Sequence, residues 1–219
     1  MHLLQIKRNR IYGFRFFVFI EYFIILSIMI TKRKIYPMLN PFIIGKRIYL
    51  RSPEPADEEI IALSENHPDP RETLYYALPS NIRIHKERIE AKQRDPHTVF
   101  FTIATINPDQ PIGCTSLVRI DWVGRMATFY IAIARKKDWD HGFGREATRL
   151  MVDYAFATLN LNRVQLHVST ENVRAVKAYE KEGFLIEGTL RQAMFHENHY
   201  SDFYLMAILR EDWEKGRKP

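Results

Sequence analysis

The sequence predicts an α+β fold with a mixed, mostly antiparallel central sheet flanked by helices. Three β-rich runs follow one another closely, separated by short polar breaks: 98–106, 112–120 and 127–134. The first break, Asn107-Pro108-Asp109-Gln110, is a strong turn signal, so we expect these strands to form an antiparallel meander. Further along, 128–134, 145–159 and 163–169 alternate as strand, helix and strand. Such a crossover places its two strands in parallel, which makes the sheet mixed.

The segment before the meander is expected to be largely helical. Ile48 and Leu50 alternate with polar neighbours as a short strand. A helix is predicted from Pro53 to Ser64, because acidic residues crowd its first turns and favour a helix N-terminus. The breaker-rich run His67-Pro68-Asp69-Pro70 then leads to a charged helix near 85–94. Connections carry function more often than the scaffold does, so we expect this region to contact the substrate.

The last third of the chain is predicted to contain one more helix and two strands. A helix begins at a cap formed by Thr170 or Asn172 and ends at Gly183. Asn172, Ala175, Val176 and Tyr179 form one stripe on this helix. From the pattern alone, a tyrosine on such a stripe is usually part of the core. Strand-like runs near 190–195 and 200–209 flank a turn at 197–199.

Charge is unevenly distributed along the 219 residues. Residues 1–37 hold seven of the 32 basic residues and one of the 26 acidic residues, so 38–219 hold 25 of each. A nucleic-acid-binding domain should carry a basic face on its folded part. The formally neutral body therefore argues against a nucleic-acid partner, although the whole chain has a net charge of +6.

The basic residues of the N-terminus flank an apolar run of 15 residues, 16–30, interrupted by Glu21. A membrane-spanning helix needs about 20 apolar residues, so a membrane contact is conceivable only through residues 11–30. Three interpretations stay open: translation starting at Met38, a membrane anchor, or an extra folded helix. We accordingly divide the chain into an appendage, 1–37, and a catalytic domain, 47–212.

The sequence contains one cysteine, Cys114, in a strand-like run. A single cysteine forms no intramolecular disulfide and fits a reducing cytoplasm. We interpret it as a buried hydrophobic residue. The histidines show no metal-ligand spacing, so no metal cofactor is expected.

A glycine-containing turn, Asp138 to Ala147, joins the third strand of the meander to the following helix. Glycine permits positive φ and lets a ligand approach the backbone closely. The first helical turn leaves N–H groups without partners inside the helix. This corner therefore suits an anion, most often a phosphate.

This turn and a second segment together resemble the GNAT superfamily of acyl-CoA-dependent N-acetyltransferases. The first segment is Trp139-Asp-His-Gly-Phe-Gly-Arg-Glu-Ala147, and the second is Asn172-Val-Arg-Ala-Val-Lys-Ala-Tyr-Glu-Lys-Glu-Gly-Phe184. The second segment matches the pattern N-x-x-A-x-x-x-Y-E-K-x-G-F, and the likeness is closest to the ribosomal-protein N-terminal and polyamine acetyltransferases. It covers roughly 47–212. It implies acetyl-CoA as co-substrate and a primary amine as acceptor: a protein N-terminus, a polyamine or a small molecule.

The resemblance also implies where the cofactor binds. Backbone groups of Ile131, Ala132 and Ile133 would bind the pantetheine arm and polarise the thioester. The pyrophosphate would meet backbone N–H groups from His141 to Glu146, with a charge-assisted contact from Arg145. The full set implied is His141, Gly142, Phe143, Gly144, Arg145 and Glu146, together with Asn172 and Tyr179 from the second segment.

By the same likeness, Tyr179 is the general acid for the CoA thiolate, and Asn172 orients the cofactor or a water. A tyrosine remains protonated at neutral pH, which suits that role. Many relatives carry glutamate where this chain has Thr128, so a glutamate base at that position is absent. His167, Glu187 or a water chain are the alternatives for the base. A non-catalytic acyl-CoA-binding module is the competing function, and a monomer or homodimer is expected.

Overall fold

The structure is a computed structural model that describes residues 38–74 and 76–217. The appendage 1–37, and with it the apolar run, lies outside these residues. The strands are β1 (Ile43–Ile44), β2 (Ile48–Arg51), β3 (Val99–Ile106), β4 (Asp109–Asp121), β5 (Met126–Ile133), β6 (Arg163–Ser169), β7 (Leu185–His196) and β8 (His199–Leu209). The helices are η1 (Pro55–Asp57), α2 (Glu58–Asn66), α3 (Pro68–Leu74), α4 (Ile82–Arg94), η2 (Lys136–Asp138), α5 (Phe143–Ala157), α6 (Val173–Glu180) and α7 (Arg210–Arg217).

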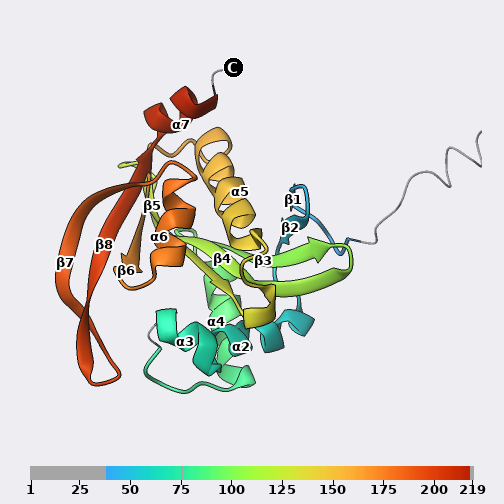
Figure 1. Ribbon diagram of the computed structural model, residues 1–219. Helices are drawn as coiled ribbons and strands as arrows, with labels where there is room; N and C mark the ends of the chain where they lie inside the picture. The colour runs from blue at the N-terminus through green and yellow to red at the C-terminus, as the bar shows by residue number, and fades with distance from the viewer. Residues whose placement is uncertain (1–37, 75, 218–219) are drawn as a thin grey trace, which may run out of the picture. The chain divides into compact units, whose positions relative to one another are not determined.

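The strands form one sheet in the order β1-β2-β3-β4-β5-β6-β8-β7 (Figure 1). Neighbouring strands are antiparallel except β5 and β6, which run in parallel and are connected in the chain through α5. The predicted mixed, mostly antiparallel α+β fold is thus confirmed. The two final strands make a long curved hairpin at the outer edge of the sheet (Figure 1).

The β5–β6 pairing is short and determines where a ligand can enter the sheet. Only Met126 to Thr128 pair with β6, opposite Arg163 to Gln165. Beyond Thr128, β5 stays paired with β4 up to Ile133, while β6 stays paired with β8 up to Ser169. The two parallel strands therefore separate, and the backbone of β5 from Phe129 onward faces a gap on its β6 side.

Helix α5 covers one face of the sheet. Its buried residues Ala147, Met151, Val152, Ala155 and Phe156 recur at helical spacing and pack on the apolar side chains of β2 to β6. The helix begins at Phe143, two residues before the predicted start, because Gly142 takes φ 77° and ends the loop. Burying such side chains contributes about 1.5–3 kcal/mol each, so this helix is firmly fixed.

Helices α2, α3 and α4 lie on the other side of the sheet (Figure 1). Ile60, Ile61 and Ile89 pack with Phe100 of β3 and against Cys114 of β4, which identifies this side as the α2–α4 face. At the start of α2, the carboxylate of Asp57 is fully buried and pairs with the Arg51 guanidinium of β2 (Nη2–Oδ1 2.7 Å). A buried, bidentate charge pair of this kind fixes the helix to the sheet, because removing either partner leaves the other uncompensated.

The expectation of a simple break at 67–70 was wrong, because Pro68 begins helix α3. Proline is tolerated in the first turn of a helix, where its missing N–H would have no intrahelical acceptor. The other expected boundaries shift by a few residues. The helix predicted from Pro53 is divided into η1 and α2, β4 begins at Asp109 inside the predicted turn, and the last strands are continuous from Leu185 to His196 and from His199 to Leu209.

Among the helices that the structure describes, none is long and apolar enough to cross a membrane.

Candidate active site

A cavity of about 460 Å³ opens where β5 and β6 separate. Its walls come from β5, from the corner between η2 and α5, from β6 and α6, and from α3. Of the predicted site residues, the lining includes Ile131, Ala132, Ile133, Gly142, Phe143, Gly144, Arg145, Asn172 and Tyr179. Two sequence segments separated by 25 residues thus meet in one cavity. His141 and Glu146 lie beside it and do not line it.

The cavity has two halves, distinguished by the face of the sheet that each belongs to. We name as the cofactor half the corner Trp139–Arg145 together with α6. We name as the acceptor half α3, Tyr130 and His167. Tyr130 shares a sheet face with Ala132, whose cross-strand neighbour Cys114 packs on the α2–α4 face. His167 lies on the same face, because the parallel register pairs Thr128 with Gln165 two residues earlier.

Backbone groups of β5 face the cavity alternately. The N–H of Ala134 donates to Ile112 of β4 at 2.9 Å. Since N–H groups along a strand point alternately to its two sides, those of Ile131 and Ile133 point away from β4 and into the gap. The Ile133 carbonyl already accepts the Trp139 indole N–H at 2.9 Å. The Ala132 amide faces β4, so this residue contributes its side chain alone.

At the corner, the helix N-terminus presents its unpaired amides to the cavity. The Glu146 N–H donates to the Gly142 carbonyl at 3.0 Å, as the first hydrogen bond of α5. The N–H groups without an intrahelical acceptor are therefore those of Gly142 to Arg145. They concentrate the positive end of the helix dipole where an anion would lie.

The Glu146 side chain has partners that the sequence did not predict. Its carboxylate accepts the N–H groups of Lys46 (2.6 Å) and Arg47 (2.9 Å), and it pairs with the Arg47 side chain (3.1 Å). Burial by itself would raise the pKa of Glu146, but these hydrogen bonds outweigh burial and lower the pKa. Glu146 therefore fastens the β1–β2 turn to α5. The carbonyl of His141 likewise accepts from Arg47, at 2.6 Å.

The cations of the cofactor half are held by specific partners. Glu182, whose side chain is buried, accepts hydrogen bonds from Arg145 Nε and from Arg149 Nε. Arg174 of α6 lies over the Trp139 ring with 4.1 Å between the guanidinium carbon and the ring centroid. The same guanidinium pairs with Asp140 (Nη1–Oδ1 3.6 Å). Lys177 of α6 and Lys181, the C-cap residue of this helix, complete the cationic lining.

Tyr179 of α6 lines the cofactor half of the cavity, next to Phe129 of β5. Its ring packs edge-on against Phe129, with centroids 6.3 Å apart, and against Phe184 at 5.8 Å. Burial raises the pKa of the Tyr179 hydroxyl to about 12, while the positive charge of Arg174 acts in the opposite direction. Among the described residues, no hydrogen-bond partner of this hydroxyl is found. The phenol is therefore protonated at neutral pH and free to donate.

Asn172 caps α6, as expected from its position. Its side-chain oxygen accepts the Ala175 N–H at 3.2 Å. The cap turns the chain out of β6 and into α6, and this sets the direction in which Tyr179 points. With its oxygen used in the cap, the Asn172 side-chain amide group remains for contacts inside the cavity.

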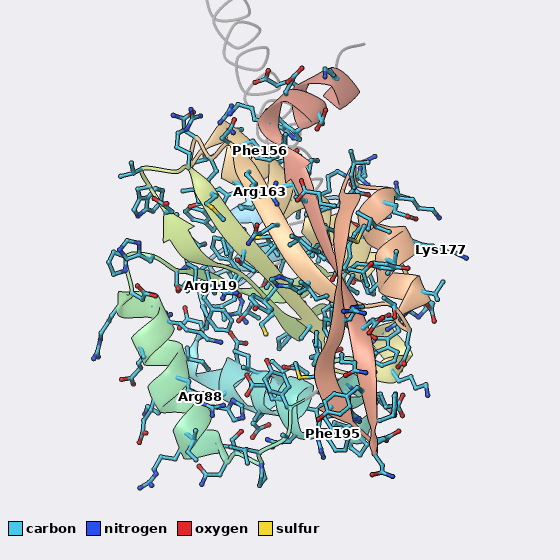
Figure 2. The ribbon with its side chains drawn as sticks, turned by 90° about the vertical axis from the view of Figure 1, so that its left-hand side faces the viewer. Arg88, Arg119, Phe156, Arg163, Lys177 and Phe195 are labelled. Carbon is cyan, nitrogen blue, oxygen red and sulfur yellow. The ribbon has the colours of Figure 1, made fainter. Side chains whose placement is uncertain are left out.

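The two candidate bases differ in their surroundings. His167 lines the cavity, and desolvation together with the charge of Arg119 lowers its pKa, so its ring is neutral at pH 7. Glu187 instead pairs with Arg163 through both oxygens (Nη1–Oε1 2.8 Å), and this pairing lowers the pKa of its carboxyl. Figure 2 shows Arg119, whose charge acts on His167, on the side of the sheet toward α4. Lys177, on α6 in the cofactor half, lies at the opposite side.

Several lining residues were not predicted. Trp139, Asp140 and Arg174 lie inside the two motifs, but nothing in the sequence predicted that their side chains contact one another. Asp138 lines the cavity with a buried carboxylate oxygen that has no hydrogen-bond partner among the described residues. Pro70, Thr73 and Leu74 of α3 line the acceptor half. Their region was expected to contact substrate, although the helix itself was missed. In the described part of the chain, no group of three or more His, Cys, Asp or Glu is arranged to hold a metal ion.

Residues 47–185 match the family model of the GNAT acetyltransferase domain. This chain belongs to the GNAT family. It is 32% identical over 182 residues to the "Probable N-acetyltransferase YjcK" of Bacillus subtilis, which covers 78% of this chain and 98% of that relative. It is 38% identical over 102 residues to the spermidine N(1)-acetyltransferase of Vibrio cholerae, covering 47% of this chain and 58% of that relative.

The fold also matches solved GNAT structures. The crystal structure of spermidine N-acetyltransferase from Vibrio cholerae in complex with CoA and spermine superimposes with a TM-score of 0.72 at 28% identity. The match covers 78% of this chain and 99% of that one. The chain is therefore an acetyl-CoA-dependent N-acetyltransferase.

Proposed function

We propose that this GNAT protein transfers the acetyl group of acetyl-CoA directly to a primary amine of a polyamine. The observation that carries the proposal is the meeting of three features in one cavity: unpaired β5 amides, the N-terminus of α5, and the protonated Tyr179 hydroxyl. Together they supply a site for the donor, polarisation of its carbonyl and a hydrogen-bond donor for its leaving group. The polyamine class is supported by the relatives, because those from Vibrio cholerae and Escherichia coli are spermidine acetyltransferases by name.

In the proposed arrangement, the cofactor runs through the gap between β5 and β6. Its pyrophosphate accepts hydrogen bonds from the N–H groups of Gly142 to Arg145, and its pantetheine arm lies along β5. The thioester oxygen gains negative charge when an amine attacks. The Ile131 N–H, which faces the gap, donates to this oxygen and stabilises the charge.

The reaction forms a C–N bond and breaks the C–S bond of the thioester in a ternary complex. Tyr179 donates its O–H to the departing sulfur. A phenol with a pKa of about 12 is a much weaker acid than a thiol with a reference pKa near 8.5, so Tyr179 acts mainly by hydrogen bonding to the developing thiolate. The sulfur can then leave as the thiolate or take a proton through this contact.

The acceptor amine enters from the acceptor half, past α3 and Tyr130. An alkylammonium has a pKa near 10, so it must lose a proton before it attacks. His167 is neutral at pH 7 and accepts this proton directly or through one water. Glu187 is held by Arg163 outside the cavity lining, which favours His167 over Glu187 as the base.

The test is the release of free CoA thiol by the purified full chain. Acetyl-CoA is combined in turn with spermidine, spermine, a diamine and a short peptide with a free N-terminus, and mass spectrometry identifies the product. We expect saturable turnover with kcat/KM for spermidine at least about tenfold above that for the peptide, a difference of roughly 1.4 kcal/mol. Turnover of the peptide alone would reject the polyamine acceptor. Acetyl-CoA binding without turnover of any amine would reject the mechanism.

A further inference from the structure

Arg174 joins the two walls of the cofactor half. It extends from the first turn of α6, after β6, whereas Trp139 and Asp140 belong to the corner that follows β5. β5 and β6 do not pair at this level, so the contact spans the entrance between the separated strands. All three residues line the cavity.

The two interactions of Arg174 differ in strength. A guanidinium over an indole ring is worth about 0.5–1 kcal/mol at exposed sites and more when it is desolvated. The ion pair with Asp140 is 3.6 Å long, and the Asp140 side chain is 78% exposed. Exposed pairs of this kind contribute about 0–1 kcal/mol. The pyrophosphate of CoA, which carries two negative charges, can therefore replace Asp140 at little cost while the stack on Trp139 keeps the guanidinium in place.

An anion bound at the corner would lie next to this guanidinium. Asp140 directly precedes the amides of Gly142 to Arg145 on which the pyrophosphate is proposed to bind. The nearest other arginine of the corner, Arg145, is already engaged at Nε by the buried carboxylate of Glu182. Of the two arginines in the described lining of the cavity, Arg174 therefore has the weaker carboxylate partner, and it comes from the opposite wall.

We propose that Arg174 is a pyrophosphate-binding clamp that exchanges the Asp140 carboxylate for a phosphate of CoA and thereby holds α6 against the α5 corner. The inference rests on the proposed acetyl-CoA site. It assigns Asp140 a competing function, since this carboxylate occupies the guanidinium until the cofactor arrives. Trp139 positions the clamp, because its indole N–H is bound to the Ile133 carbonyl and its ring supports the guanidinium.

Calorimetric titration of the full chain with acetyl-CoA tests the clamp. We expect Arg174→Ala to weaken binding about tenfold, the equivalent of one charge-assisted hydrogen bond. Arg174→Lys should recover only part of this loss, because lysine lacks the planar fork and stacks poorly. Lys136→Ala is the matched control: it removes an exposed cation of η2 that does not line the cavity, and the affinity should stay within about twofold.

Asp140→Asn should have the opposite effect to Arg174→Ala on the affinity for acetyl-CoA. It should tighten binding about twofold to threefold, because the competing carboxylate is removed. Removing any acid near an anionic ligand also helps through the long-range field, so the decisive measurement is a double-mutant cycle. In the Arg174→Ala background, the gain from Asp140→Asn should fall to the part that the long-range field contributes. An equal gain in both backgrounds, or unchanged affinity in Arg174→Ala, overturns the clamp.

Intrinsic fluorescence provides a second measurement. The chain has three tryptophans, and Trp139→Phe identifies the signal of the one beneath Arg174. Acetyl-CoA should change this signal in the parent chain and not in Arg174→Ala at saturating ligand. Absence of acetyl-CoA binding in the parent chain would reject the proposed cofactor site itself. Binding and turnover that do not depend on Arg174 would reject the clamp alone.

Discussion

The two halves of the cavity are built from different kinds of sequence. The cofactor half comes from two short segments, 139–145 and 172–181, and relies on backbone amides, a helix N-terminus and one capped helix. The acceptor half combines α3, Tyr130 of β5 and His167 of β6, and it relies on side chains from elements far apart in the chain. A donor shared by a whole family can be bound by backbone geometry, whereas an acceptor must be selected by side chains.

Tyr179 is the proposed hydrogen-bond donor to the leaving sulfur, so its replacement should have the largest effect. We expect Tyr179→Phe to lower kcat on the order of 10³-fold, within the range for a lost acid–base group. The KM for either substrate should change little, because the ring still packs on Phe129 and Phe184. Steady-state kinetics with both substrates varied measures this. A kcat within a few-fold of the parent would show that the thiolate leaves without help from Tyr179.

The raised pKa of Tyr179 also predicts how kcat depends on pH. A phenol with a pKa of about 12 keeps its proton throughout the neutral and moderately alkaline range. Any loss of kcat between about pH 8 and 10 must then have another cause than ionisation of Tyr179. The pH profiles of the parent chain and of Tyr179→Phe should therefore share the same shape in that interval, at different heights.

His167 tests the acceptor half. We expect His167→Gln to lower kcat/KM for the amine on the order of 10²-fold while binding of acetyl-CoA is retained. The effect should be smaller than that of Tyr179→Phe, because a water chain can carry the proton in place of a side chain. Unchanged kcat/KM for the amine would remove His167 from the mechanism.

The pH dependence gives the same residue a second test. Desolvation and the charge of Arg119 lower the pKa of His167. The enzyme should therefore lose activity through protonation of His167 only below pH 6.5. Arg119→Gln removes a positive charge and should move this acid limb upward, toward pH 6.5. The same diamine acceptor is used for the parent chain and for Arg119→Gln. The titration of the amine then affects both pH profiles equally and cancels in their ratio. An acid limb that stays at the same pH in Arg119→Gln would show that the charge of Arg119 does not act on the proton acceptor.

Local sequence patterns predicted the backbone geometry of the cofactor half, for a physical reason. Strand alternation, Gly142 at positive φ and the cap at Asn172 depend on neighbours within a few residues, and these requirements are visible in the chain. The position of Glu146 shows the limit. The sequence predicted a contact of its backbone N–H with the pyrophosphate and no partner for its carboxylate, which binds Lys46 and Arg47, about 100 residues earlier. Such long-range partners leave no local signal.

The acceptor half was harder to predict for the same reason. Helix α3 was missed because Pro68 and Pro70 resemble a break, although both lie in a first helical turn, where proline is tolerated. Which face Tyr130 and His167 share follows from the β4–β5 and β5–β6 registers, and register depends on the whole sheet. The contact between Arg174 and Trp139 across the cavity likewise needs the strands to separate first.

Two glycines of the corner provide the smallest and most selective test of the cofactor half. A Cβ on Gly144 would meet only Ile133 Cγ1, at 3.9 Å, which is an ordinary contact. Gly144→Ala should therefore fold normally and gain about 0.5–1 kcal/mol, as alanine is the better helix former. A methyl group at this amide would nevertheless obstruct a closely approaching pyrophosphate. We expect the KM for acetyl-CoA to rise about tenfold, with the KM for the amine unchanged.

Gly142→Ala is the matched control, because its effect should fall on folding. Gly142 has φ 77°, where an alanine costs about 1–2 kcal/mol, so the melting temperature should drop. Thermal unfolding and steady-state kinetics of the two variants separate the functions of the two residues. If Gly144→Ala leaves the KM for acetyl-CoA unchanged while it stabilises the chain, the glycine serves the turn alone. The backbone of the corner would then not approach the pyrophosphate closely, and the contrast between the two halves would lose its main support.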